Sequence, residues 1–324
     1  MPHAHSIIGR WFLLVGVALG LLGCASASWT PAPVEDAWSE APVGEAPLLV
    51  DNDLPLTPVT IDGQGPYLFV VDTGASVSAL DHTLIRRLGY DEQAGETATI
   101  HGVAGETETR TFTLDSLRVA HQLIADVRVV AADLSPFPGA DTLRYGGILG
   151  HDVLQEFDIS YNLADRSLAL YPHEEERADE WAAADSLHRI PFRNQGTDLD
   201  VITLDLTLRD QRVEGVLDTG SRNSVLNWTA AGLKGIKQDT VSTSHETIGF
   251  SGTPAPTYVH SFDSLYVDSL RFQAQRASVT ELPVLEGPTE RPAMLVGNNM
   301  LRDRVVKIAY SRRELYVSTP QSDP

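Results

Sequence analysis

Residues 70–76 read Val-Val-Asp-Thr-Gly-Ala-Ser, and residues 216–222 read Val-Leu-Asp-Thr-Gly-Ser-Arg. These two stretches decide the fold, because an apolar pair followed by Asp-Thr-Gly returns after 146 residues in a chain of 324. An internal repeat of this length indicates two similar halves rather than one continuous core.

Two further landmarks repeat in the same order. Residues 101–105 (HGVAG) match residues 248–252 (IGFSG), and the apolar-apolar-Gly segment 148–150 matches 295–297, both at an offset of 147. Each half then closes with a similar strand pair, at 157–161 with 168–171 and at 305–310 with 314–317. The constant order and spacing indicate a duplicated unit.

The local sequence patterns are mainly those of β-strands. Alternating or β-branched runs at 112–114 and 201–208 are bounded by Gly, Asp and Pro, which predicts strands. Short helices are expected at 83–88 and 226–233. The sequence therefore predicts an all-β protein of two lobes with few short helices.

In each half an apolar strand runs into an aspartate, where a buried carboxylate is costly unless it is paired or protonated. Glycine lets the backbone turn sharply there, and threonine can lock the turn by hydrogen bonding. If the two loops face each other, one carboxylate ionises while the other keeps its proton, which gives an acid and a base in one site. We expect catalytic Asp72 and Asp218, supported by Thr73, Gly74, Thr219 and Gly220.

These motifs resemble the aspartic protease clan over roughly residues 47–318, and its bacterial retropepsin-like branch more closely than the pepsins. The resemblance implies two β-barrel lobes related by a pseudo-twofold axis, a polypeptide substrate bound in extended form, and no cofactor or metal. Because both copies lie in one chain, it implies a monomeric active unit. It places the flaps, which contact substrate, at Gly102, Val103, Gly249 and Phe250.

Three positions break the repeat. Arg222 stands where the first half has Ser76, and it suits either a structural salt bridge or substrate selection. Asn298 and Asn299 stand where the first half has His151 and Asp152, so we expect the two lobes to differ in stability. None of these changes removes a predicted catalytic carboxylate.

The N-terminus predicts a lipoprotein leader. A short apolar run ends in Leu-Leu-Gly-Cys at 21–24, which resembles a bacterial lipobox, and Cys24 is the only cysteine. An ordinary secretory signal is the alternative. We expect a signal peptide at 1–23, a tether at 24–46 that could also cover the cleft, lobes at 47–172 and 189–318, a linker at 173–188 and a tail at 319–324. The membrane would then be a partner only through the lipid, at the bacterial cell envelope.

Composition excludes several other classes. With 44 acidic and 24 basic residues the formal charge is -20, which argues against nucleic acid as a partner. The ten histidines show no metal-ligand spacing, and no Gly-x-Ser-x-Gly elbow or phosphate-loop lysine is present. A non-catalytic peptide-binding lipoprotein and a structural envelope module remain as alternatives on the same fold.

Overall fold

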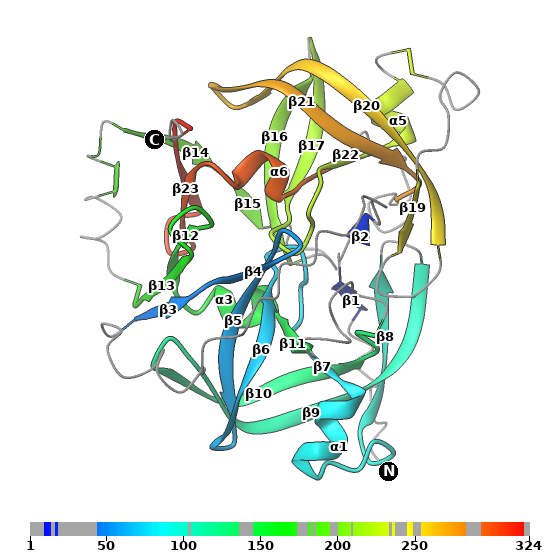
Figure 1. Ribbon diagram of the computed structural model, residues 1–324, viewed down its shortest axis with the longest axis vertical. Helices are drawn as coiled ribbons and strands as arrows, with labels where there is room; N and C mark the ends of the chain where they lie inside the picture. The colour runs from blue at the N-terminus through cyan, green and yellow to red at the C-terminus, as the bar shows by residue number, and fades with distance from the viewer. Residues whose placement is uncertain are drawn as a thin grey trace, which may run out of the picture.

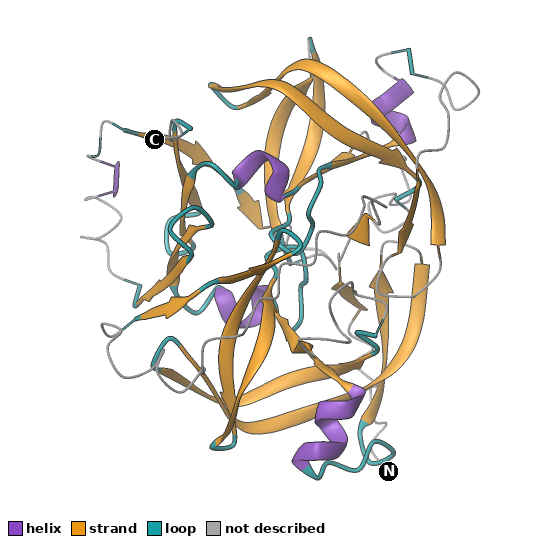
Figure 2. Ribbon diagram, in the orientation of Figure 1, coloured by secondary structure: helices purple, strands orange, loops and turns teal. Residues whose placement is uncertain are grey.

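The computed structural model describes residues 10–13, 17–18, 44–102, 105–135, 145–173, 181–182, 184, 186–194, 200–208, 210–232, 235–236, 245–248, 254–282 and 293–320. These residues form three β-sheets, with one lobe below and one above in Figure 1 and a third sheet beside both. Strands dominate, and the four helices in this part of the chain are short (Figure 2). The expectation of an all-β, two-lobed protein is confirmed.

The first lobe is a nine-stranded sheet in the order β1-β8-β9-β10-β7-β11-β6-β5-β4. The long strand β9 also pairs with β5 through residues 117–119, so the sheet curls onto itself and encloses a core. Its strands are β1 (Arg10–Leu13), β4 (Leu49–Asp51), β5 (Leu54–Ile61), β6 (Gln64–Val71), β7 (Ala79–Asp81), β8 (Glu96–Gly102), β9 (Gly105–Val119), β10 (Gln122–Ala132) and β11 (Tyr145–Leu149).

The second lobe repeats this arrangement in the order β15-β16-β17-β22-β18-β21-β20-β19-β2. Here β20 pairs with β16 through residues 265–267, the counterpart of the β9–β5 closure. Its strands are β2 (Val17–Ala18), β15 (Arg193–Asn194), β16 (Ile202–Leu208), β17 (Gln211–Leu217), β18 (Val225–Asn227), β19 (His245–Ile248), β20 (Pro254–Val267), β21 (Leu270–Thr280) and β22 (Ala293–Val296).

A third sheet of six strands joins the halves, in the order β14-β24-β23-β12-β13-β3. The strand pairs expected at the end of each half are present, but they do not close separate lobes. Instead β12 of the first half pairs with β23 of the second, from Ile159 opposite Ile308 to Asn162 opposite Val305. The strands are β3 (Glu45–Pro47), β12 (Asp158–Asn162), β13 (Ser167–Tyr171), β14 (Leu187–Pro191), β23 (Val305–Ala309) and β24 (Glu314–Ser318).

The helices sit at strand ends. Helix α1 (His82–Leu88) begins at Asp81, whose carboxylate accepts the Thr83 N–H, and ends at Gly89 with φ 87°. The other helices are α3 (His151–Leu154), α5 (Trp228–Gly232) and α6 (Asn298–Leu301). No helix among the described residues is long and apolar enough to cross a membrane.

Candidate active site

Each Asp-Thr-Gly loop starts where a central strand ends. Strand β6 lies parallel to β11, and β17 lies parallel to β22 in the same way. The backbone N–H of Asp72 donates to Leu149 O at 3.0 Å, and that of Asp218 donates to Val296 O at 3.0 Å. The apolar-apolar-Gly segments therefore lie behind the aspartate loops, as the repeat predicts.

The two loops meet through their threonines. Thr73 N–H donates to Thr219 Oγ1 at 3.0 Å, and Thr219 N–H donates to Thr73 Oγ1 at 3.2 Å. Each hydroxyl also donates across to the other half, Thr73 Oγ1 to Leu217 O and Thr219 Oγ1 to Val71 O, both at 2.8 Å. These four buried hydrogen bonds fix the loops against each other, so the predicted supporting residues are in contact.

The glycines of the loops allow the aspartates to approach. A Cβ atom built on Gly74 would lie 2.7 Å from Asp218 Cγ, and one built on Gly220 would collide with the Asp72 carboxyl group. Since each glycine packs against the aspartate of the opposite loop, any larger residue would push the carboxyl groups away. The structure thus brings together all six residues predicted from the two motifs.

The two carboxyl groups are fully buried and unequally hydrogen-bonded. Asp72 Oδ1 accepts the N–H groups of Gly74 at 2.8 Å and Ala75 at 3.1 Å. No described residue donates a hydrogen bond of normal geometry to Asp72 Oδ2 or to either carboxyl oxygen of Asp218. The Gly220 and Ser221 amides stabilise the charged form of Asp218, and the two carboxyl groups interact side chain to side chain, so a proton held by one of them can bridge the pair.

Burial shifts the titration of both groups. It raises the pKa of Asp72 to about 7, although the Gly74 and Ala75 amides counteract it. Burial, followed by the nearby Asp72 carboxyl, raises the pKa of Asp218 well above its usual value. Two carboxyls that share a site cannot both ionise easily, so the pair retains one proton and holds a base beside an acid.

A second pair of equivalent contacts lies behind each loop. Ser78 Oγ accepts the Gly150 N–H and donates to Asp152, while Ser224 Oγ accepts the Gly297 N–H and donates to Asn299. The sequence analysis did not predict Ser78 or Ser224 as site residues. Their own offset of 146 residues is the signal that could have identified them as part of the repeat.

Asn298 links the two halves beneath the site. Its Nδ2 donates to Thr219 O at 2.8 Å and to Asp53 O at 3.1 Å, and its Oδ1 accepts the hydroxyl of Tyr161 at 2.9 Å. The equivalent His151 is also buried; its Nε2 lies 3.8 Å from Asp200 Oδ1, and the Gln155 side chain also interacts with the ring. The sequence analysis identified Asn298 as a break in the repeat. It did not predict the contact with Tyr161, because no local sequence pattern indicates it.

Arg222 is held in an acidic setting. Its Nε and Nη2 are buried without a hydrogen-bond partner in the described part of the chain, while Tyr145, Asp51 and Asp53 lie near enough to interact electrostatically. Burial lowers the pKa of Arg222, and these neighbours counteract that effect. Tyr145 in turn donates its hydroxyl to Asp51.

The predicted flap residues are only partly described. Gly102 ends β8 and pairs with Gly105 at the start of β9, which places it next to the hairpin tip. Val103, Gly249 and Phe250 lie outside the described residues, as does Cys24. Hairpins β8–β9 and β19–β20 do point toward the same side of the molecule in Figure 1.

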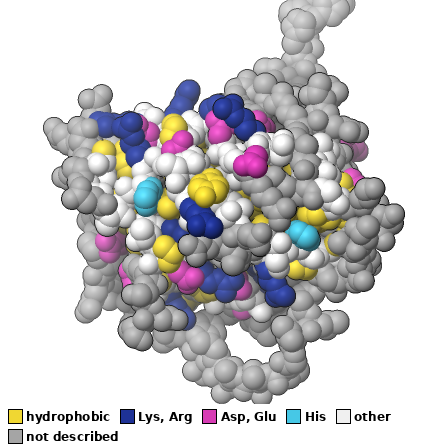
Figure 3. All heavy atoms as spheres, turned by 90° about the horizontal axis from the view of Figure 1, so that it is seen from above, with side chains coloured by type: hydrophobic (Ala, Val, Ile, Leu, Met, Phe, Trp, Pro, Cys, Tyr) yellow, Lys and Arg dark blue, Asp and Glu magenta, His cyan; other side chains and the backbone are white. Residues whose placement is uncertain are grey.

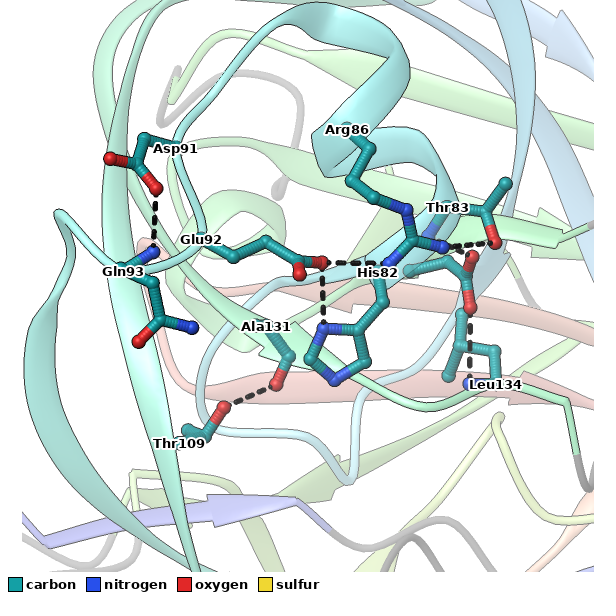
Figure 4. Close-up of polar contacts among 10 residues, drawn as sticks. His82, Thr83, Arg86, Asp91, Glu92, Gln93, Thr109, Ala131 and Leu134 are labelled. Atoms are coloured by element: carbon teal, nitrogen blue, oxygen red, sulfur yellow. Dashed lines mark hydrogen bonds and ion pairs between the residues drawn. The ribbon is translucent and has the colours of Figure 1, made fainter.

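A separate polar cluster surrounds helix α1 (Figure 4). Glu92 bonds both His82 Nδ1 at 3.2 Å and Arg86 Nη1 at 3.0 Å, which ties the loop after α1 to the helix. This cluster is structural. Across the described ranges, no group of three or more His, Cys, Asp or Glu side chains could hold a metal ion.

The surface charges are mixed. Figure 3 shows Lys and Arg side chains interspersed with Asp and Glu on the described part of one face. Interspersed charges of both signs do not form the continuous basic stripe that a phosphate backbone needs.

Comparison with known families gives one match. A family model described as aspartyl protease matches residues 57–153 and again residues 204–300, which together make up more than half of the chain. Each matched segment contains one Asp-Thr-Gly loop and its apolar-apolar-Gly partner. No curated protein matches the chain.

Proposed function

This chain belongs to the aspartyl protease family, and we propose that it is an active endopeptidase that hydrolyses extended polypeptides with Asp72 and Asp218. The observation that carries this proposal is the pair of fully buried carboxyl groups in contact, whose pKa values are both raised by burial. Such a pair can ionise one carboxyl while the other keeps its proton. Both halves of the site come from one chain, so the active unit is a monomer.

The reaction follows from the shared proton. The ionised carboxylate takes a proton from water as its oxygen attacks the peptide carbonyl carbon, and the protonated carboxyl donates to the carbonyl oxygen. The resulting tetrahedral intermediate collapses with cleavage of the C–N bond. The carboxyl that took the proton from water gives it to the departing nitrogen, while the other carboxylate takes back a hydroxyl proton from the intermediate as the carbonyl forms again. The pair thereby returns to its singly protonated state.

We also propose that the chain is a lipid-anchored envelope protein of bacterial origin. The support is the apolar run that ends in Leu-Leu-Gly-Cys at 21–24. Labelling with a radioactive fatty acid in a bacterial host should modify the parent chain and leave Cys24→Ala unlabelled. Equal labelling of both would exclude the anchor.

The catalytic proposal is tested with residues 25–324. Every core residue that the structure describes lies at or after Ala46, so the shortened protein of residues 25–324 keeps all of them. Cleavage of a mixture of denatured proteins is compared for the parent, Asp72→Asn and Asp218→Asn. We expect each substitution to slow cleavage by about a hundredfold to ten-thousandfold, because one acid or base is lost.

Asp205→Asn serves as the matched control, because the Asp205 side chain is 81% exposed on β16 and should leave cleavage unchanged. Equal cleavage by the parent, Asp72→Asn and Asp218→Asn would end the proposal. A parent that binds peptides without cleaving them, with undiminished affinity in the Asn variants, would identify a non-catalytic peptide-binding protein instead.

A further inference from the structure

The two halves place different side chains behind their aspartate loops. Asp152 in α3 and Asn299 in α6 are equivalent, because they are 147 residues apart, as are the apolar-apolar-Gly segments before them. Asn299 Oδ1 accepts the N–H of Ser224 at 2.7 Å and its hydroxyl at 2.8 Å. Asp152 likewise accepts the hydroxyl of Ser78 at 2.7 Å and a hydrogen bond from its backbone. As acceptors, the two side chains therefore make the same contacts.

The strand beside each of these side chains is also equivalent. The N–H of Val130 in β10 donates to Ser78 O at 3.0 Å, and the N–H of Ser278 in β21 donates to Ser224 O at 2.8 Å. The residue two positions earlier is an arginine in both strands. Backbone groups of residues two apart in a strand point to the same side, so both arginine carbonyls face the serine and the side chain bound to it.

Asn299 makes one further contact on this side. Its Nδ2 donates to the carbonyl of Arg276 in β21 at 2.8 Å. The equivalent carbonyl for Asp152 is that of Arg128 in β10. An ionised carboxylate accepts hydrogen bonds and donates none, whereas a protonated carboxyl has one O–H to donate. Asp152 can therefore reproduce the contact of Asn299 in its protonated form alone.

The surroundings of Asp152 favour the protonated form. Burial raises the pKa of its carboxyl to about 6, and the hydrogen bonds from Ser78 and Val153 counteract this only in part. The second half has no such titration, because its side chain at this position is a neutral amide. The two aspartate loops therefore differ in how their support responds to pH.

Charged side chains on the elements around Asp152 have other partners. Three contacts show this: Arg128 on β10 with Glu96 at 3.1 Å, Asp81 of β7 with the Thr83 N–H at 2.7 Å, and His151 on α3 with Asp200 at 3.8 Å. A proton is therefore the means by which the Asp152 carboxyl becomes neutral.

Asp152 supports the loop of Asp72 through the segment that precedes it. Ser78 Oγ, which donates to Asp152, accepts the Gly150 N–H at 2.9 Å. The adjacent Leu149 carbonyl accepts the Asp72 N–H at 3.0 Å. Asp152 is thus connected to the backbone of a predicted catalytic residue by three hydrogen bonds in series.

We propose that Asp152 is a positioning residue whose proton controls how firmly residues 149–152 hold the Asp72 loop. The protonated carboxyl donates to the Arg128 carbonyl, as Asn299 donates in the second half. When the carboxyl ionises, this donor is lost and two acceptors face each other, so the loop shifts and kcat falls. The effect on kcat rests on the proposed endopeptidase activity, whereas the contact can be measured without it.

The test uses the full chain and two reciprocal substitutions. Asp152→Asn gives the first half the permanent donor of the second half. Asn299→Asp gives the second half a carboxyl that must be protonated to donate. Asp152→Ala removes the contact at every pH, and Asp205→Asn is the control, because the Asp205 side chain is 81% exposed.

The first measurement is kcat and KM against pH. Asp152→Asn should match the parent at about pH 5 and exceed its kcat about threefold at about pH 7. Asn299→Asp should lose about threefold more than the parent between these pH values, and Asp152→Ala should be slow at both. KM should stay within about twofold throughout, because Asp152 lies behind the loop rather than against substrate.

The second measurement is urea denaturation of the same chains, which needs no substrate. The folded pKa of Asp152 is raised to about 6 from about 3.9 in the unfolded chain, so its contribution to stability is complete below about pH 4 and declines as pH rises through 6. Asp152→Asn should make the decline between pH 5 and pH 7 shallower, and Asn299→Asp should make it steeper.

A ratio of kcat between Asp152→Asn and the parent that is the same at every pH would overturn the proposal, because it would leave Asp152 a purely structural role. Parallel stability profiles of these two chains would overturn it as well. If no chain cleaves substrate while the reciprocal substitutions change the stability profile in opposite directions, the proton-dependent contact is supported and the endopeptidase proposal alone fails.

Discussion

Thr73 and Thr219 donate their hydroxyls to backbone carbonyls of opposite halves, and each accepts the other's N–H. Replacing Thr73 by valine removes its hydroxyl. The Leu217 carbonyl then loses the hydrogen bond from this hydroxyl, and the Thr219 N–H loses its acceptor, although both groups stay buried. We expect Thr73→Val to lower the free energy of unfolding by about 2 to 3 kcal/mol, measured by urea denaturation, and to reduce cleavage.

Thr203→Val is the matched control for that change. Thr203 is also buried, yet its hydroxyl has no hydrogen-bond partner among the described residues, so valine should be neutral or stabilising. A loss of stability at Thr203 as large as that at Thr73 would contradict the role given to the threonine contacts.

Gly220→Ala should abolish cleavage by displacing a carboxyl group. The new methyl group would collide with the Asp72 carboxyl, which its own loop holds through the N–H groups of Gly74 and Ala75. Gly232→Ala provides the comparison, because nothing lies within 4 Å of its added Cβ in helix α5. We expect kcat to fall at least about a hundredfold only at Gly220. Unchanged kcat in Gly220→Ala would show that the loops tolerate a wider separation.

The paired carboxyl groups of Asp72 and Asp218 should lower the free energy of unfolding as pH rises. The folded pKa of Asp72 is raised to about 7, whereas an unfolded aspartate titrates near about 3.9. The folded state thus binds more protons between these values, so its stability is greatest below about pH 4 and declines as pH rises through 7. Asp72→Asn should make this decline shallower, because Asp218 keeps a pKa that burial raises, and urea denaturation from pH 4 to pH 8 would detect the difference. An identical pH dependence in both proteins would refute it.

His151 should have the opposite effect. Burial lowers its pKa to about 4, and Asp200 at 3.8 Å only partly offsets this. The unfolded state then binds the proton first, so stability is complete above about pH 6.5 and declines as pH falls toward 4. His151→Leu should lose less stability than the parent between pH 8 and pH 5, measured by thermal unfolding. The difference in stability between the two proteins at pH 8, where His151 is neutral, measures the effect of leucine on packing. If both proteins lost the same stability between pH 8 and pH 5, His151 would not be the group responsible.

The duplicated motif allowed the fold and the dyad to be predicted from the sequence, because each landmark is local and recurs at a fixed spacing. The short helices predicted at 83–88 and 226–233 are present as α1 and α5, at His82–Leu88 and Trp228–Gly232. The shared third sheet was not predicted. Its central pairing joins β12 to β23, and hydrophobic alternation specifies that a strand exists without specifying its partner.

The remaining site contacts depend on tertiary structure. Tyr161 reaches Asn298 across 137 residues, and Asn298 reaches the Asp53 carbonyl across 245. The pairing of β1 with β8 and of β2 with β19 was missed for a different reason: the sequence analysis interpreted the apolar run near the N-terminus as a targeting signal, and nothing in that run indicates a strand partner.

The contact between β12 and β23 also affects how the chain must fold as it leaves the ribosome. When the first half has emerged, β12 has β13 on one side, and its other edge stays open until residues 305–309 have been synthesised. Such an edge can recruit the same strand from another incompletely folded molecule, so we expect exchange of halves between neighbouring chains when this protein misassembles. Dilute synthesis or a chaperone that shields this edge would favour the monomer.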